Sequence, residues 1–128
     1  LHNDNQKFIC KNTFLKPVSK SSNITKNIDF NNTYKIPIAH GEGRYYADEQ
    51  AIDKMFSNNQ VLFQYCDSSG DVSEINNPNG STKNIAGVSN SQQNVMGMMP
   101  HPERAVDSLL GNEDGVHLFN SLLNRVWA

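Results

Sequence analysis

The chain has 128 residues, enough for one domain with a hydrophobic core. A formal net charge of −2 excludes an electrostatic case for binding nucleic acid or an anionic membrane surface. No apolar run approaches the roughly 20 residues that span a bilayer, and no secretory signal opens the chain. The two cysteines, Cys10 and Cys66, lie in unrelated contexts, so we expect free thiols in a reducing cytoplasm rather than a disulfide.

The predicted elements mix strands with helices. In chain order they are a strand at 6–12, a turn-rich surface loop at 19–33, a strand at 34–40, a helix at 48–56, a strand at 61–66, a turn at 77–80, strands at 85–90 and 95–99, a short helix at 104–110 ended by Gly111, and a last helix at 114–123. Pro37 favours an edge position for the second strand, and Asp48 is the expected N-cap of the first helix. Strands interspersed with helices predict an α/β fold.

The stretch 94–104 runs from an apolar strand into a histidine and a glutamate framed by prolines. Proline fixes its own φ and keeps the preceding residue out of the α region, so we expect an extended chain as far as Glu103. Residues two apart then share a face, which brings His101 and Glu103 together. A lone His-x-Glu is more often a structural pair that closes a loop. A rigid strand end is where α/β sheets place chemistry, however, so we expect the base and orienter of a nucleophilic triad.

A second His-x-Glu pair, His40 and Glu42, is flanked by Gly41 and Gly43. The two imidazoles and two carboxylates could bind a metal ion, so a metal-dependent hydrolase stays open as an alternative. The sequence has no third motif with the spacing of metal ligands beside them. The glycines fit a turn as readily as a ligand cradle, and they match no phosphate-loop pattern.

Two long motifs, at 36–48 and 97–104, resemble the glutamine amidotransferase subunit of phosphoribosylformylglycinamidine synthase, and so does the linking stretch 77–87. The resemblance runs over nearly the whole chain. It implies a class I glutaminase with a Cys-His-Glu triad, on a flavodoxin-like mixed sheet flanked by helices.

The same resemblance assigns roles to individual residues. It implies that His101 is the base and Glu103 its orienter, and that His40, Glu42 and Arg44 have substrate-side or partner-interface roles. It implies no metal and no cofactor in this subunit.

In that family a cysteine attacks the side-chain amide of glutamine, ammonia leaves, and water hydrolyses the glutamyl thioester to glutamate. The resemblance implies delivery of the ammonia to a large synthase subunit that uses ATP and Mg, with a small accessory subunit as a further partner. The partner then converts formylglycinamide ribonucleotide to the amidine, a step of purine synthesis.

The sequence departs from the family at the nucleophile. The family's cysteine sits on a Gly-x-Cys-x-Gly elbow between a strand and a helix, and neither Cys10 nor Cys66 has these flanking glycines. The chain also opens at Leu1, so we expect residues 1–128 to be the C-terminal half of a glutamine amidotransferase type 1 domain, with the nucleophile-elbow half absent. Since loss of a single oxyanion donor costs roughly 10²- to 10³-fold in rate, we expect no glutaminase activity from this chain alone. A non-catalytic interaction or regulatory fragment stays open as the alternative, and we expect uncovered apolar surface and exposed sheet edges.

Overall fold

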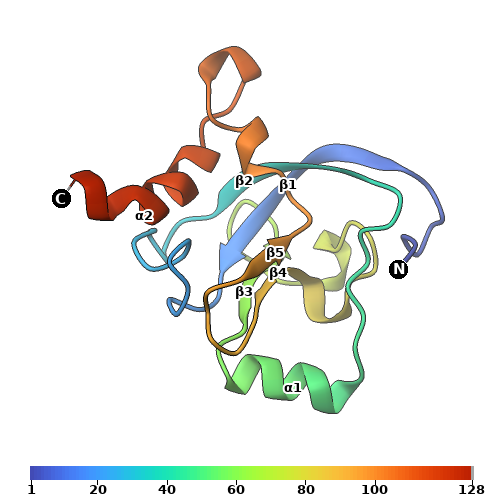
Figure 1. Cartoon of the computed structure of the whole chain (residues 1–128). Helices are drawn as coiled ribbons and strands as arrows, with labels where there is room; N and C mark the ends of the chain where they lie inside the picture. Colours follow the sequence, from blue (N-terminus) through green and yellow to red (C-terminus); the bar gives the residue numbers. More distant parts are fainter. Residues whose placement is uncertain (128) are drawn as a thin grey trace.

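A five-stranded antiparallel sheet with two α-helices forms the molecule in the computed structural model, which describes residues 1–127 (Figure 1). The strands are β1 Ile9–Pro17, β2 Tyr34–His40, β3 Val61–Cys66, β4 Ile85–Ser89 and β5 Met96–Met98, and the helices are α1 Glu49–Ser57 and α2 Gly115–Trp127. Short 3₁₀ turns lie at η1 Glu74–Asn76, η2 Thr82–Asn84, η3 Pro102–Arg104 and η4 Ser108–Leu110. The strand order is β2-β1-β3-β4-β5.

The α/β class predicted from the sequence is confirmed. The resemblance implied a mixed sheet, whereas all four strand pairs of residues 1–127 are antiparallel. Within the same residues no helix is long and apolar enough to cross a membrane.

The larger core lies between the β1–β2–β3 part of the sheet and α2. Alternate residues of β2 point into it, which is the period expected of a strand with one buried face. Leu118 of α2 and Ala105, just after η3, complete this core, and both are fully buried. The core therefore connects the sheet to the segment that carries His101 and Glu103.

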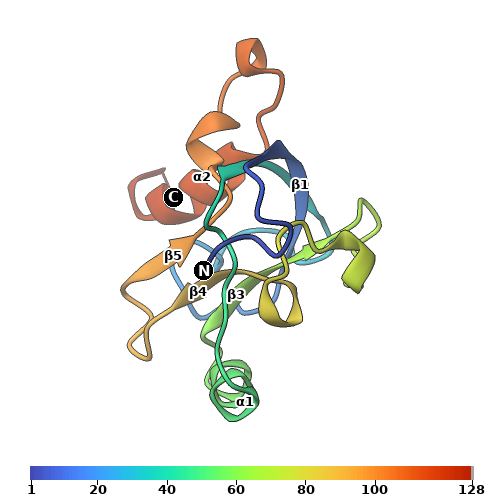
Figure 2. The same ribbon diagram turned by 90° about the vertical axis from the view of Figure 1, so that its right-hand side faces the viewer.

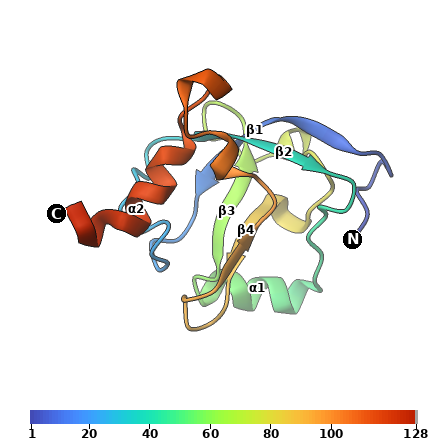
Figure 3. The ribbon, with the colours of Figure 1, turned by 45° about the horizontal axis from the view of Figure 1, so that its top comes forward.

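The smaller core lies under α1. The carboxylate of Asp48 accepts a hydrogen bond from the backbone N–H of Ala51 and caps the helix, as predicted. Ile52 is the buried residue of this helix, and it packs with Val61 and Ile85. Figures 2 and 3 show α1 at the β3–β4 side of the molecule, well apart from α2.

Pro37 lies in an edge strand, as predicted, since β2 pairs only with β1 among the described strands. Proline has no N–H to donate, but its carbonyl accepts a hydrogen bond of 2.8 Å from the backbone N–H of His101. Farther along the same edge, Asp114 and Asn112 bind the backbone of Lys35. Later parts of the chain thus cover this edge, whereas β5 pairs only with β4 within residues 1–127.

The expected surface loop at 19–33 is wrong in part. The segment has no regular element, but Ile24 and Ile28 are buried in the larger core. The hydroxyl of Ser121 on α2 holds the segment down, since it donates to the carbonyl of Asn23 and accepts from the backbone N–H of Asn27. Contacts with a helix almost a hundred residues later therefore bury a stretch that reads locally as polar turns.

Other elements also differ from the predictions. The first strand begins at Ile9 rather than at residue 6, because Gln6 has a positive φ of 56° that breaks the extended chain. The predicted helix at 104–110 is wrong: the chain forms the two separate 3₁₀ turns η3 and η4 instead. Gly111 does end the second turn, in the left-handed region at φ 83°.

Candidate active site

The segment after β5 brings His101 and Glu103 into direct contact. The Nδ1 atom of His101 and the Oε1 atom of Glu103 are 2.8 Å apart. The chain does not stay extended as far as Glu103, as the prolines had suggested. Pro102 instead begins the turn η3, which suits the φ that its ring imposes, and the backbone N–H of Arg104 donates to the carbonyl of His101. The pair is as predicted, but a tight turn forms it.

The hydrogen bond sets the tautomer of the imidazole. A carboxylate only accepts, so Nδ1 of His101 carries the proton and Nε2 keeps a free lone pair. Burial by itself would raise the pKa of Glu103. The bond from its own backbone N–H, the bond from His101, and the charges of His101 and Arg104 outweigh that effect and lower the pKa below its ordinary value. Glu103 is therefore ionised at neutral pH and orients the imidazole, with the lone pair on Nε2.

Backbone hydrogen bonds connect the segment around His101 to two strands of the sheet and to the start of α2. The backbone N–H of Met99 donates to the carbonyl of Ala86 on β4, and that of His101 donates to Pro37 on β2. On its far side, the backbone N–H of Gly115 donates to the carbonyl of Ala105 with a length of 2.8 Å. The side chain of His101 remains about one-third exposed.

Neither cysteine lies on an elbow between a strand and a helix. Both are free thiols, as predicted. Cys10 is exposed within β1, opposite Ala39 of β2. Cys66 ends β3 and is followed by a turn rather than a helix; burial, with a contribution from Asp67, raises the pKa of its thiol to about 11. A thiol with that pKa is almost entirely protonated at neutral pH and is a poor nucleophile.

His40 lies beneath the 41–46 loop rather than on it. The residue is 9% exposed, and its Nδ1 atom lies 3.0 Å from Oδ1 of Asn3. Its Nε2 atom faces the side-chain nitrogen of Asn79 at 3.4 Å. Because the Asn79 group is a donor and Oδ1 of Asn3 is an acceptor, His40 is neutral with its proton on Nδ1. Burial lowers the pKa of His40. A hydrogen bond with its own backbone partly offsets this, and the charge that His101 carries when protonated lowers the pKa further.

The two asparagines also bind the loop itself. Oδ1 of Asn3 accepts from the backbone N–H of Gly43, and the side chain of Asn79 donates to the Gly43 carbonyl. A Cβ atom at Gly43 would overlap the imidazole ring of His40, so only glycine lets the loop lie this close. Sequence reasoning missed Asn3 and Asn79. The only signal was the asparagine-rich turn at 77–80, and it was interpreted as a turn alone.

Glu42 and Arg44 stand on the outer side of this loop. Glu42 is largely exposed, and its Oε1 atom lies 3.3 Å from Nδ1 of His2, a contact that becomes an ion pair when His2 is protonated. The guanidinium of Arg44 donates through Nε to the carbonyl of Gly80 and lies over the ring of Tyr46. The two His-x-Glu pairs do not converge on a common centre, because both ring nitrogens of His40 face asparagines and Glu42 turns toward His2. Within residues 1–127 no group of three or more His, Cys, Asp or Glu side chains could hold a metal ion.

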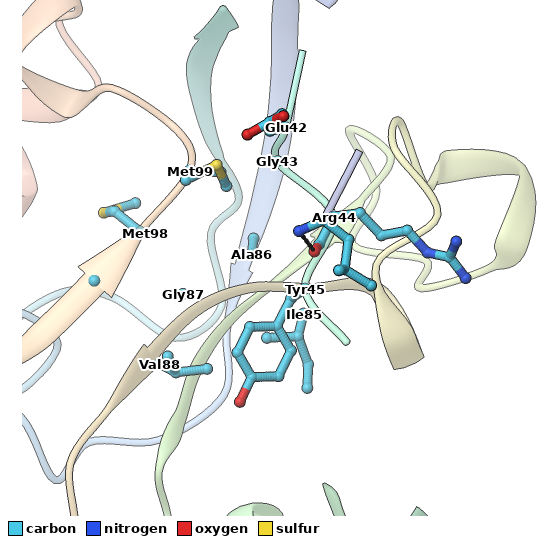
Figure 4. A pocket seen from close by; sticks show the side chains of 12 residues that line it. Glu42, Gly43, Arg44, Tyr45, Ile85, Ala86, Gly87, Val88, Met98 and Met99 are labelled. Carbon is cyan, nitrogen blue, oxygen red and sulfur yellow. Dashed lines mark hydrogen bonds between the residues drawn. The ribbon is translucent and has the colours of Figure 1, made fainter. Parts of the chain in front are cut away.

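A cavity of about 330 Å³ opens beside the loop (Figure 4). Its apolar floor comes from β4 and β5 and from Met99, and the loop residues 42–45 form the opposite wall. Met99 lies two residues before His101, so the cavity and the His101–Glu103 pair share one segment of chain. Glu42 and Arg44 flank the cavity, and the pair His101–Glu103 forms outside its lining.

Comparisons with known proteins agree with this arrangement. Residues 1–117 match the family model of the CobB/CobQ-like glutamine amidotransferase domain. The chain is 49% identical over 124 residues to "Phosphoribosylformylglycinamidine synthase subunit PurQ" of Aquifex aeolicus, a match that covers 97% of this chain and 55% of that protein. The protein of the same description from Methanocaldococcus jannaschii is 46% identical over 123 residues, which is 96% of this chain and 54% of that protein.

A solved structure is similar as well. It is described as PurLQS from Thermotoga maritima, with a TM-score of 0.77 and 40% identity over 98% of this chain and 51% of that one. The chain thus spans about half the length of the curated relatives that it matches.

Proposed function

The chain belongs to the family of CobB/CobQ-like glutamine amidotransferase domains, and on this premise we propose that it works within the glutamine amidotransferase subunit of phosphoribosylformylglycinamidine synthase. That subunit hydrolyses glutamine to glutamate and ammonia for the synthesis of formylglycinamidine ribonucleotide. The observation that carries the proposal is the 2.8 Å hydrogen bond between His101 and Glu103. It supplies the base and the orienter that amide hydrolysis by a thiol requires.

In the proposed mechanism, Nε2 of His101 takes the proton of a cysteine thiol, and the thiolate forms a bond to the side-chain carbonyl carbon of glutamine. The carbon–nitrogen bond breaks as His101 returns the proton to the departing nitrogen, which leaves as ammonia. Water, deprotonated by the same nitrogen, then attacks the thioester and releases glutamate and the thiol. Glu103 holds Nδ1 and stabilises the imidazolium at each stage.

We propose that this cysteine comes from residues outside the 128 in hand. Cys66 is buried with a raised pKa, and Cys10 lies within a strand rather than on a strand-to-helix elbow. This agrees with the domain assignment proposed from the sequence. In that assignment residues 1–128 are the C-terminal half of the domain and carry two of the three triad members.

The remaining site residues receive supporting roles. Glu42 and Arg44 flank the cavity beside Met99, which supports the substrate-side or partner-interface roles proposed for them. His40 is buried, so its proposed contribution is to hold the 41–46 loop rather than to touch a ligand.

The proposed partners are the large synthase subunit, which would use ATP and Mg, and a small accessory subunit. The proposed compartment is the cytoplasm, in keeping with two unpaired thiols.

A glutaminase assay tests the proposal. The chain is incubated with L-glutamine alone, and then after co-expression with the part of the Aquifex aeolicus subunit that it does not span. We expect glutamate only from the combined halves, and a loss of roughly 10²- to 10⁴-fold with His101→Ala, because a positioned general base contributes about that much. His117→Ala, which changes an exposed histidine of α2, is the matched control and should leave turnover unchanged.

Two results would contradict the proposal. Turnover by the chain alone that His101→Ala abolishes would place the nucleophile within these residues. Equal turnover by the combined halves with and without His101 would remove the residue from the mechanism and favour the alternative of a non-catalytic interaction fragment.

A further inference from the structure

A loop of residues 105–114, here called the leucine loop, projects from the molecule between η3 and α2 (Figures 1 and 2). Its tip is formed by Leu109 and Leu110, which are 93% and 59% exposed. Leu109 is therefore almost wholly in water. Single exposed apolar residues are common on protein surfaces, but two neighbouring exposed leucines at the end of a projecting loop indicate a site of interaction.

Local hydrogen bonds fix the tip of the leucine loop. The carboxylate of Asp107 accepts from the backbone N–H of Leu109 at 2.8 Å, and the Asp107 carbonyl accepts from Leu110 at 2.9 Å. Gly111 then takes the left-handed conformation and donates to the carbonyl of Ser108. The two leucines are thus presented by a closed turn, so little backbone entropy remains to be lost when a partner binds.

The base of the leucine loop is fixed as well. Asp107 and Asn112 form an antiparallel bridge across the neck of the loop. The side chain of Asn112 donates to the carbonyl of Lys35, and the carboxylate of Asp114 accepts from the Lys35 backbone N–H at 2.7 Å. These bonds join the loop to the edge of β2, so the leucines have a defined position relative to the sheet.

The segment that carries the two leucines is acidic in sequence. Residues 103–114 contain four carboxylates (Glu103, Asp107, Glu113 and Asp114) against the single guanidinium of Arg104, a net charge of −3. The complementary surface is an apolar socket with lysines or arginines at its rim. An interface of that kind excludes water around the leucines and attracts the loop electrostatically.

We propose that Leu109 and Leu110 dock this chain onto the large ATP-dependent synthase subunit, in an apolar socket with a basic rim. The inference rests on the proposed function for the identity of the partner. The loop begins at Ala105, immediately after η3, and Gly115 at its end donates back to Ala105. A protein bound at the leucine loop is therefore connected, through Ala105, to the segment that carries His101 and Glu103. A subunit that receives ammonia must be aligned with this segment.

Calorimetric titration of the chain with the purified large synthase subunit from the same source tests this surface. The test variant is Leu109→Ser with Leu110→Ser. The control is Leu122→Ser with Leu123→Ser, a second pair of neighbouring, half-exposed leucines, on α2. We expect the test variant to weaken binding roughly a hundredfold, as central interface anchors do, and the control to change it less than about threefold. The melting temperatures of test variant and parent should agree, because the tip leucines make few contacts within the chain.

The charge of the loop gives a second measurement. Glu113→Gln should reduce the dependence of the affinity on salt concentration while leaving the melting temperature unchanged. Equal affinities of the parent and the serine variant, or equal losses in the test and control variants, would overturn the docking surface alone. A serine variant that melts lower than the parent, or that only abolishes self-association, would show that the leucines face another part of the protein or a second copy. No binding by the parent chain would overturn the proposed function together with this inference.

Discussion

Gly115 joins the start of α2 to the turn that holds the His101–Glu103 pair, and replacing it with alanine should disturb both. A Cβ atom there would lie 2.8 Å from the carbonyl oxygen of Ala105 and 2.9 Å from the carbonyl carbon of Pro102, and closer still to the Pro102 oxygen. Carbon atoms pack best at about 3.5 to 4.0 Å. The backbone around η3 must therefore retreat by at least about 0.6 Å at the carbonyl carbon of Pro102, and by more at its oxygen, since no flexible side chain can yield in its place.

Overpacking of this kind costs about 1–3 kcal/mol, and the better helix propensity of alanine returns at most about 1 kcal/mol. The net loss of about 1–2 kcal/mol lowers the melting temperature by about 4–8 °C in a domain of this size. Because Pro102 lies between His101 and Glu103, the shift also lengthens the hydrogen bond between them, and ¹⁵N NMR of the His101 ring should show the proton less firmly fixed on Nδ1.

Gly97→Ala is the matched control, since a Cβ atom at Gly97 would meet nothing within 4 Å. It should leave the melting temperature and the ring resonances of His101 unchanged. A Gly115→Ala protein that melts at the parent temperature with unaltered His101 resonances would refute the claim that the start of α2 fixes the geometry of the pair.

Three further predictions concern the buried network and the thiols. Gly43→Ala places a methyl group in the ring of His40, and in urea unfolding it should cost about 2–6 kcal/mol, as overpacking plus a lost buried hydrogen bond. A cost below about 1 kcal/mol would mean that the loop can move away from His40 freely. Because the pKa of His40 is lowered in the folded state, the unfolded chain binds more protons below about pH 6.5, so the free energy of unfolding should decrease as the pH falls through that range. His40→Gln should lose part of this dependence, and identical pH profiles for the two proteins would contradict the assignment. Iodoacetamide at pH 8 should label Cys10 in the folded protein and Cys66 only in urea, since burial raises the pKa of the Cys66 thiol to about 11. Rapid labelling of Cys66 in the folded protein, detected by mass spectrometry, would disprove its burial.

Elements with strong local signals were predictable from the sequence. Asp48 marks the start of α1, and the alternation of β2 with its proline gives an edge strand. The hairpin of β4 and β5 follows from two apolar runs separated by a polar turn. In each case the residues that specify the element lie within it or directly beside it, so no knowledge of distant contacts was needed.

Other features depend on contacts that a local pattern does not contain. Ile24 and Ile28 lie in a polar stretch without a helical or strand period, and α2 provides their burial. The 104–110 segment has helical composition, but Asn112 and Asp114 bind Lys35 and hold the chain in a different path.

The site shows the same division. The contact between His101 and Glu103 was predictable because the two residues are two apart with Pro102 between them, although the turn η3 rather than an extended chain brings them together. The roles of Asn3 and Asn79 around His40 were not, because a buried asparagine has no distinctive sequence context.

The bond from His101 to the carbonyl of Pro37 also bears on the order of folding. During synthesis the acceptor, Pro37, leaves the ribosome more than sixty residues before the donor, His101. The outer edge of β2 therefore stays uncovered until the later segment has been made. Long-range closures of this kind are slow to form. The His101–Glu103 arrangement is therefore among the last parts of the molecule to be assembled, and a polypeptide released early would expose the β2 edge to chaperones and to other strands.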